Sequence, residues 1–332
     1  MPLVNYLVWM GVRGFAKPLA RETAVPVKGP ANGWRTLGDI GRENGRSAEI
    51  VKTGTWFVLL SLSALVVIMY ASVLSSLARQ WWTDPNYGHG FFVLVFAGYV
   101  LWSESGRWRA VPVRPTNLGL VIMLFAVGLR VLGMLGAELF ISRLSLVILI
   151  SGLVLFLAGR QVLQSMAFPI SYLLLMIPLP GIVYFQLTFP LQLWASRLAA
   201  GGLVALGIHT VRQGNLLMLP NCTLNVVEAC SGIRSLLSLL AAAVAYGYLA
   251  ESSVWKRVAL AIASIPIAIA ANGLRLVATG VLSYFFGPRV DSGLLHLTLG
   301  MGFFGLAFLA LVLVHKLLGL YWGHQNPAPV AP

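Results

Sequence analysis

Charged residues are scarce in this 332-residue chain: Asp, Glu, Lys and Arg together make up only 10% of it, whereas 58% of the residues are hydrophobic. This composition excludes an ordinary soluble domain, in which about a quarter of the residues are charged. Several apolar stretches approach or exceed the roughly 20 residues that cross about 30 Å of hydrocarbon. Because a backbone in lipid must satisfy its polar groups internally, we expect an all-α polytopic membrane protein.

Cysteine, histidine and acidic residues are also few. The two cysteines and five histidines show no metal-ligand spacing, and no glycine-rich phosphate loop follows a strand, so the sequence predicts neither a metal site nor a cofactor. The net charge of +13 does not indicate nucleic-acid binding, because the basic residues lie between apolar stretches, where they report orientation. The N-terminus lacks a signal-peptide pattern, so the first span is expected to act as its own insertion signal.

Hydropathy divides the chain into a basic cytoplasmic tail at 1–54, a multi-spanning domain at 55–320 and a short C-terminal tail at 321–332. Residues 191–208 are apolar but contain Arg197, which favours an interfacial helix. Turn signals in "HTVRQGNLLMLPNCTLNVVE" predict an outer hairpin-like loop. The eight expected spans are 55–76, 89–102, 118–134, 139–158, 163–179, 230–249, 257–278 and 294–317.

The distribution of basic residues predicts the orientation of these spans. With the N-terminus in the cytoplasm, fifteen of the 23 Lys and Arg residues fall on the inner side, as the positive-inside rule requires. A ninth span at 191–208 would move Lys256 and Arg257 outside, so the eight-span arrangement is favoured. The inner residues are the eight in the tail, Arg107, Arg109, Arg114, Arg160, Lys256, Arg257 and Lys316.

This topology brings three chemically useful residues to one depth on the outer face. Cys230 lies at the outer start of one span, Arg275 near the outer end of the next, and His296 in the first turn of the last. Their sequence separations do not require this convergence. The positions of Lys and Arg alone predict this topology, so the convergence of the three residues is independent support for a functional site.

Each of the three residues could have a catalytic role or a purely structural one. A helix N-terminus and Arg234 would favour the thiolate of Cys230, although cysteine is also a common packing residue in apolar helices. Arg275, with Asn272 one turn before it, could stabilise an oxyanion or could extend to lipid headgroups. His296 at a helix start would stay neutral and accept a proton, or could be a packed core residue.

Other residues are candidates for supporting roles. Glu228 could accept a hydrogen bond or remain solvated, Ser231 forms the small step after the cysteine, and His89 in "DPNYGHG" could line a substrate entrance or belong to a capped loop. Cys222 could be an incidental neighbour, a resolving thiol or a disulfide partner in an oxidising compartment. The incidental interpretation is favoured, because a disulfide would silence Cys230.

Four segments in this order resemble the exosortase/archaeosortase family of membrane transpeptidases: "FPISYLLLMIPLP", "LPNCTLNVVEACSGIRSLLSLL", "ANGLRLVATG" and the downstream His296. The earlier "WWTDPNYGHGFFVLVFAGYVLW" extends the likeness, which covers about 55–318. The resemblance implies that the family's catalytic cysteine, arginine and histidine correspond to Cys230, Arg275 and His296.

The resemblance also implies a substrate and a place. The substrates would be exported proteins with a C-terminal signal made of a short Pro-Glu-Pro-like motif, a transmembrane helix and a basic end. A thioester acyl-enzyme would form, and water, a lipid or an exopolysaccharide would resolve it. The expected location is the bacterial inner membrane, with the active site facing the periplasm and both termini in the cytoplasm.

Two other classes of function stay open. In a transporter, Arg130, Arg143 and Arg275 would line an anion path through the bilayer, but no inverted repeat is visible in the sequence. A scaffold for polysaccharide export would need no reactive cysteine.

Overall fold

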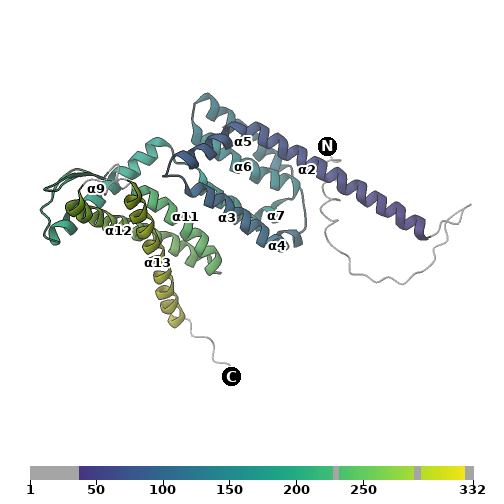
Figure 1. The fold of residues 1–332 in the computed structure, drawn as a ribbon. Coiled ribbons are helices and arrows are strands. Elements are labelled where there is room, and N and C mark those ends of the chain that lie inside the picture. Colours follow the sequence, from purple (N-terminus) through teal and green to yellow (C-terminus); the bar gives the residue numbers. More distant parts are fainter. Residues whose placement is uncertain (1–36, 227–231, 288–292, 326–332) are drawn as a thin grey trace, which may run out of the picture. The chain divides into compact units, whose positions relative to one another are not determined.

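The computed structural model describes residues 37–226, 232–287 and 293–325. In these ranges six helices are long and apolar enough to cross a membrane, and a helix pair broken at 177–180 would make a seventh (Figure 1). The predicted all-α polytopic membrane fold is therefore confirmed. The count of eight stays a prediction, because the apolar helix at the second expected span, α3 (His89–Ser103), has only 15 residues.

The six helices that could each cross a membrane agree with six of the predicted spans. The first begins inside a longer helix, α2 (Leu37–Thr83), whose start lies within the segment expected to be a tail. The six are Leu60–Thr83 of α2, α5 (Leu118–Leu135), α6 (Leu139–Leu157), α11 (Gly232–Ala250), α12 (Val254–Phe286) and, within α13 (Gly293–Gln325), Leu297–Gly319.

The chain forms two compact units, the first built from residues up to Leu77 and Ala97–Leu174, the second from Ala78–Phe96 and the chain from Leu175 onward. In the first unit, α5 and α6 form a helical hairpin that packs closely because glycine faces the partner helix at several points. A Cβ on Gly119 would collide with the backbone of Phe156, and one on Gly133 with Ser142. The shorter helices of this unit are α4 (Ser105–Ala110), α7 (Arg160–Ser165) and α8 (Ala167–Tyr172).

Helix α12 is the central element of the second unit, since it contacts α9 (Gly181–Ala205), α11 and α13 (Figure 1). Glycines again allow the close approach: a Cβ on Gly280 would lie 2.8 Å from Leu203 of α9. A 3₁₀ turn, η1 (Leu173–Met176), precedes the break before α9. The segment expected to be interfacial, 191–208, lies almost wholly within α9.

The predicted hairpin-like loop is a small antiparallel sheet of β1 (Val211–Gln213), β2 (Leu216–Met218) and β3 (Thr223–Asn225). Gly214 opens the β1–β2 turn with a φ of 63°, a conformation that favours glycine. Leu217 and Leu224 face each other across β2 and β3, and both are buried in a cluster with side chains of α9 and α12. The sheet is therefore fixed to the helices.

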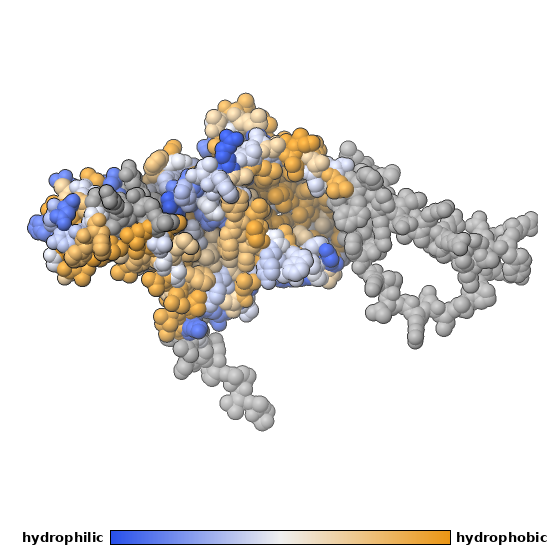
Figure 2. Space-filling view, viewed as in Figure 1, coloured by the Kyte–Doolittle hydropathy of each residue, from blue (hydrophilic) through white to orange (hydrophobic). Residues whose placement is uncertain are grey.

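Apolar side chains cover much of the helical surface on the face drawn in Figure 2. On α13, Leu297, Met301, Leu309 and Leu313 are each more than half exposed. Surfaces this apolar are not stable in water, and lipid would cover them. The exposure thus agrees with a multi-pass membrane protein.

Candidate functional site

Asn272 and Arg275 lie three residues apart on α12, so their side chains project from the same face of the helix. Asn272 is only 4% exposed, and its Oδ1 is buried with no hydrogen-bond partner among the described residues. Both side chains line the same pocket. Burying the Asn272 Oδ1 atom and the Arg275 guanidinium in an apolar domain costs free energy. This cost makes the pair a candidate site for binding a polar group.

The start of α11 lies against Asn272. A Cβ added to Gly232, the first residue of α11, would come within 3.0 Å of the Asn272 Nδ2 atom. Gly232 follows Cys230 by two residues in the sequence. The chain that carries the predicted nucleophile therefore enters α11 beside the amide of Asn272.

The first turns of α13 approach the same face of α12. A Cβ on Gly300 would lie 3.6 Å from the Arg275 Cζ atom, which is ordinary contact distance. His296 occurs four residues before Gly300, one turn nearer the start of α13. Arg275 is thus next to the helix that carries the predicted proton acceptor.

A small open pocket lies among α11, α12 and α13. Asn272, Arg275 and Ser235 supply its polar groups, and the Ser235 hydroxyl donates to the Gly232 carbonyl at 3.1 Å. The rest of the lining is apolar or small: Leu239, Ala268, Ala271, Gly300, Phe303, Phe304 and Ala307. The polar groups of the pocket are therefore set in a mostly apolar lining.

A family model for transmembrane exosortases (Exosortase_EpsH) matches residues 81–313, which include α11, α12 and the first turns of α13. The chain belongs to the transmembrane exosortase family. Membership indicates a membrane transpeptidase in protein sorting, of the cysteine type. A search of curated proteins and a search of solved structures each find no match to the chain.

Several predicted site residues of this exosortase lie outside the described residues. These are Cys230, Glu228 and Ser231, which occur just before α11. His296 is described only as a residue of the α13 helix. Of the three predicted catalytic residues, the structure therefore places the side chain of Arg275.

Arg234 and His89 contact other parts of the exosortase chain instead of the pocket. The Arg234 Nε donates to the Asn86 Oδ1 atom at 3.3 Å, which fixes α11 to the 84–88 turn. The His89 Nε2 donates to the Leu175 carbonyl at 3.2 Å. Neither residue is among those that line the pocket.

Sequence reasoning did not predict Ser235, Gly300 or the two phenylalanines of the pocket. The pattern for part of it is visible in the sequence: Ala268, Ala271, Asn272 and Arg275 follow the i, i+3, i+4, i+7 spacing of one helical face. Small residues on the same face as a polar pair leave room for a ligand. No comparable sequence pattern predicts that residues of α13 line the pocket.

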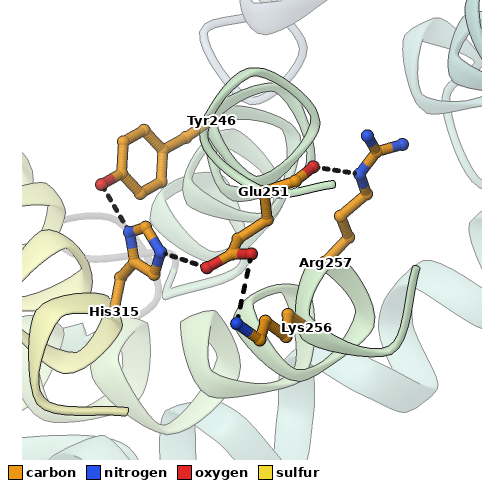
Figure 3. Close-up of polar contacts among 5 residues, drawn as sticks. All are labelled: Tyr246, Glu251, Lys256, Arg257 and His315. Atoms are coloured by element: carbon orange, nitrogen blue, oxygen red, sulfur yellow. Dashed lines mark hydrogen bonds and ion pairs between the residues drawn. The ribbon is translucent and has the colours of Figure 1, made fainter. Parts of the chain in front are cut away.

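A second polar cluster joins α11, α12 and α13 at the far end of α11 (Figure 3). The His315 Nε2 donates to the Glu251 Oε1 atom at 3.0 Å, and the Tyr246 hydroxyl donates to His315 Nδ1 at 2.7 Å when the ring is neutral. The Lys256 Nζ lies 3.6 Å from Glu251 Oε2, and Arg257 Nε donates to the Glu251 carbonyl at 2.7 Å. The His315 hydrogen bond and the Lys256 charge hold the pKa of Glu251 below its ordinary value of 4.5.

Proposed function

We propose that this exosortase is a cysteine transpeptidase that cleaves the C-terminal sorting signal of exported proteins. The observation that carries the proposal is the position of Asn272 and Arg275, which face the start of α11 on one side and the first turns of α13 on the other. Nucleophile, oxyanion donors and base would then come from three adjacent helices. The residues involved would be Cys230, Arg275 with Asn272, and His296.

The first chemical step would form a thioester. The Cys230 thiolate attacks the carbonyl carbon of the scissile peptide bond, and the charge moves to the carbonyl oxygen. The guanidinium of Arg275 and the amide N–H of Asn272 donate to this oxyanion. The C–N bond then breaks, and the leaving amine takes from His296 the proton that the imidazole had accepted from the Cys230 thiol when the thiolate formed, as in other cysteine and serine acyl transfers.

The second step would release the acyl group to an acceptor. A hydroxyl, an amine or water attacks the thioester carbon while His296 accepts its proton, and Cys230 leaves as the thiolate. A cell-surface lipid or an exopolysaccharide is the acceptor that suits an outward-facing site. The pocket that includes Arg275 has a mostly apolar lining, which favours apolar over charged substrate side chains beside the scissile bond.

The substrate and orientation belong to the same proposal. A substrate with a short motif, one transmembrane helix and a basic end would place its scissile bond at a fixed depth, because the basic end stays on the cytoplasmic side. The active site would face the periplasm of a bacterial inner membrane, and both termini the cytoplasm. The charge distribution supports this orientation.

The test follows an exported reporter that ends in a Pro-Glu-Pro motif, a transmembrane helix and a basic tail taken from the same organism. It is co-expressed with the natural chain, with Cys230→Ala and with the matched control Cys222→Ala. We expect a shortened reporter with the natural chain and with Cys222→Ala only. Processing by Cys230→Ala at equal abundance would refute the nucleophile, and no processing by the natural chain would favour transport or scaffolding.

The intermediate can be sought directly. In the purified chain, intact mass should increase by the mass of the reporter's N-terminal part, and hydroxylamine should remove that increase as a hydroxamate. An adduct that resists hydroxylamine would not be a thioester.

A further inference from the structure

Asn272 has a buried acceptor that no described residue satisfies. Its side chain is 4% exposed, and its Oδ1 atom has no hydrogen-bond partner among the described residues. An acceptor left unpaired away from water costs free energy, and nearly all such atoms in proteins are paired. Asn272 also lines the pocket among α11, α12 and α13, so a group bound there can supply the missing donor.

The two ends of the Asn272 amide face different surroundings. A Cβ added to Gly232 would meet the Nδ2 atom at 3.0 Å and the Cγ atom at 3.5 Å, whereas the Oδ1 atom is not within 4 Å of it. The donor end of the amide is therefore the end nearer the start of α11. Neither Ser235 nor Arg275, the other polar side chains of the pocket, donates to Oδ1.

An amide side chain matches the backbone of one extended residue. In an extended chain the N–H and the C=O of a residue point to the same side, as they do in a hydrogen-bonded pair of an antiparallel sheet. Asparagine presents N–H donors at Nδ2 and a carbonyl acceptor at Oδ1. A single asparagine can therefore donate to the carbonyl oxygen of such a residue and accept from its N–H.

Building on the proposed thioester chemistry, we propose that Asn272 holds the substrate residue that carries the scissile carbonyl by both of its backbone groups. Nδ2 donates to the carbonyl oxygen together with Arg275, and Oδ1 accepts from the N–H of the same residue. The second bond fixes the rotation of that residue, so that its carbonyl carbon faces the nucleophile. Proline has no backbone N–H, so the exosortase selects against proline at this substrate position.

The selection should be strong because the acceptor is buried. With alanine at the position, the substrate N–H satisfies Oδ1, whereas proline leaves Oδ1 unpaired in the complex. A site built to hydrogen-bond a substrate group discriminates strongly against an analogue that lacks the group. We expect proline to weaken binding at least about tenfold relative to alanine.

The test first identifies the residue that carries the scissile carbonyl, from the mass of the shortened reporter. Two further reporters carry alanine or proline at that position. Both are processed by the natural chain, by Asn272→Leu, by Asn272→Asp and by the matched control Asn117→Leu, which alters an exposed asparagine of the first unit. Melting temperatures show which variants fold, and Asn272→Ala replaces Asn272→Leu if leucine prevents folding.

A second measurement reads binding without turnover. The affinity of each unprocessed reporter is measured in detergent for Cys230→Ala and for Cys230→Ala combined with Asn272→Leu. These affinities decide the outcome if Asn272→Leu processes too slowly for its rates to be compared.

We expect the natural chain and Asn117→Leu to prefer the alanine reporter at least about tenfold. Asn272→Leu should treat the two reporters alike, whereas Asn272→Asp, which keeps an acceptor and loses the donor, should be slower on both and still prefer alanine. Proline at this position in the first reporter, equal affinity of Cys230→Ala for the two reporters, or a preference that persists in Asn272→Leu would overturn the role of Oδ1. A natural chain that processes no reporter, or a Cys230→Ala variant that processes one, would instead refute the proposed sorting chemistry.

Discussion

The imidazole of His315 donates to the carboxylate of Glu251 at 3.0 Å, and this contact joins α13 to the turn between α11 and α12. The two side chains are 15% and 14% exposed, so water competes little for the bond. The three helices joined here are those that line the pocket at Arg275. The cluster therefore holds the helices of the site together at a distance from it.

Loss of this contact should destabilise the second unit. His315→Ala leaves Glu251 and the Tyr246 hydroxyl without their shared partner, at a cost of about 1–3 kcal/mol. We expect a lower apparent melting temperature in detergent. The control is His209→Ala, since His209 is exposed. Equal melting temperatures for the two variants would contradict the prediction.

The stabilising effect of Glu251 should depend on pH in one direction. Its pKa is lowered in the folded chain, chiefly by the His315 hydrogen bond, so the folded state favours the carboxylate. The contribution is complete above the ordinary value of 4.5 and is lost as pH falls through the lower, folded pKa. The melting-temperature difference between the natural chain and Glu251→Gln should persist at pH 5.5 and vanish at more acidic pH. A difference that grows on acidification would contradict the sign.

Only part of this architecture was predictable from the sequence. Hydropathy located α5, α6 and α11 to within a few residues, because a membrane span needs a fixed length of apolar chain. It did not predict that α12 extends over Val254–Phe286 with Pro266 inside it. Neighbouring helices can compensate for a proline's missing N–H, and hydropathy does not contain that information.

The candidate site, too, was only partly predictable from the sequence. Arg275 and Asn272 could be chosen because a polar pair in an apolar helix is conspicuous, and the i, i+3 spacing puts both on one face. The contacts of Gly232 with Asn272 and of Gly300 with Arg275 depend on how three helices pack. Glycine is common in membrane helices, so nothing in the sequence distinguishes these two from the rest.

Reporter processing should depend on the planar guanidinium of Arg275 as well as on its charge. Lysine at this position keeps the cation but presents a point charge, so Arg275→Lys should lower reporter processing about 10²-fold, as loss of an oxyanion donor does. Arg197→Lys is the matched control, since Arg197 is exposed. Processing rates are compared at equal protein abundance. Full activity of Arg275→Lys would exclude a paired hydrogen bond to the oxyanion.

Reporter processing should also depend on the free space beside the Arg275 side chain. A Cβ at Gly300 would lie 3.6 Å from the Arg275 Cζ, so alanine fits, whereas leucine would displace the guanidinium or fill the pocket. We expect Gly300→Ala to process the reporter and Gly300→Leu to lose most of its activity while remaining folded. Gly302→Leu is the control on the same helix, because nothing lies within 4 Å of a Cβ there. Equal activity of the two leucine variants would show that the pocket is not used.

The α5–α6 hairpin should depend on Gly133 and not on Gly128. A Cβ at Gly133 would collide with Ser142 of α6, whereas none of the described atoms lies within 4 Å of a Cβ at Gly128. Overpacking of this kind costs about 1–3 kcal/mol, so Gly133→Leu should lower the melting temperature and Gly128→Leu should not. Equal melting temperatures for the two leucine variants would show that the hairpin does not depend on the close approach at Gly133.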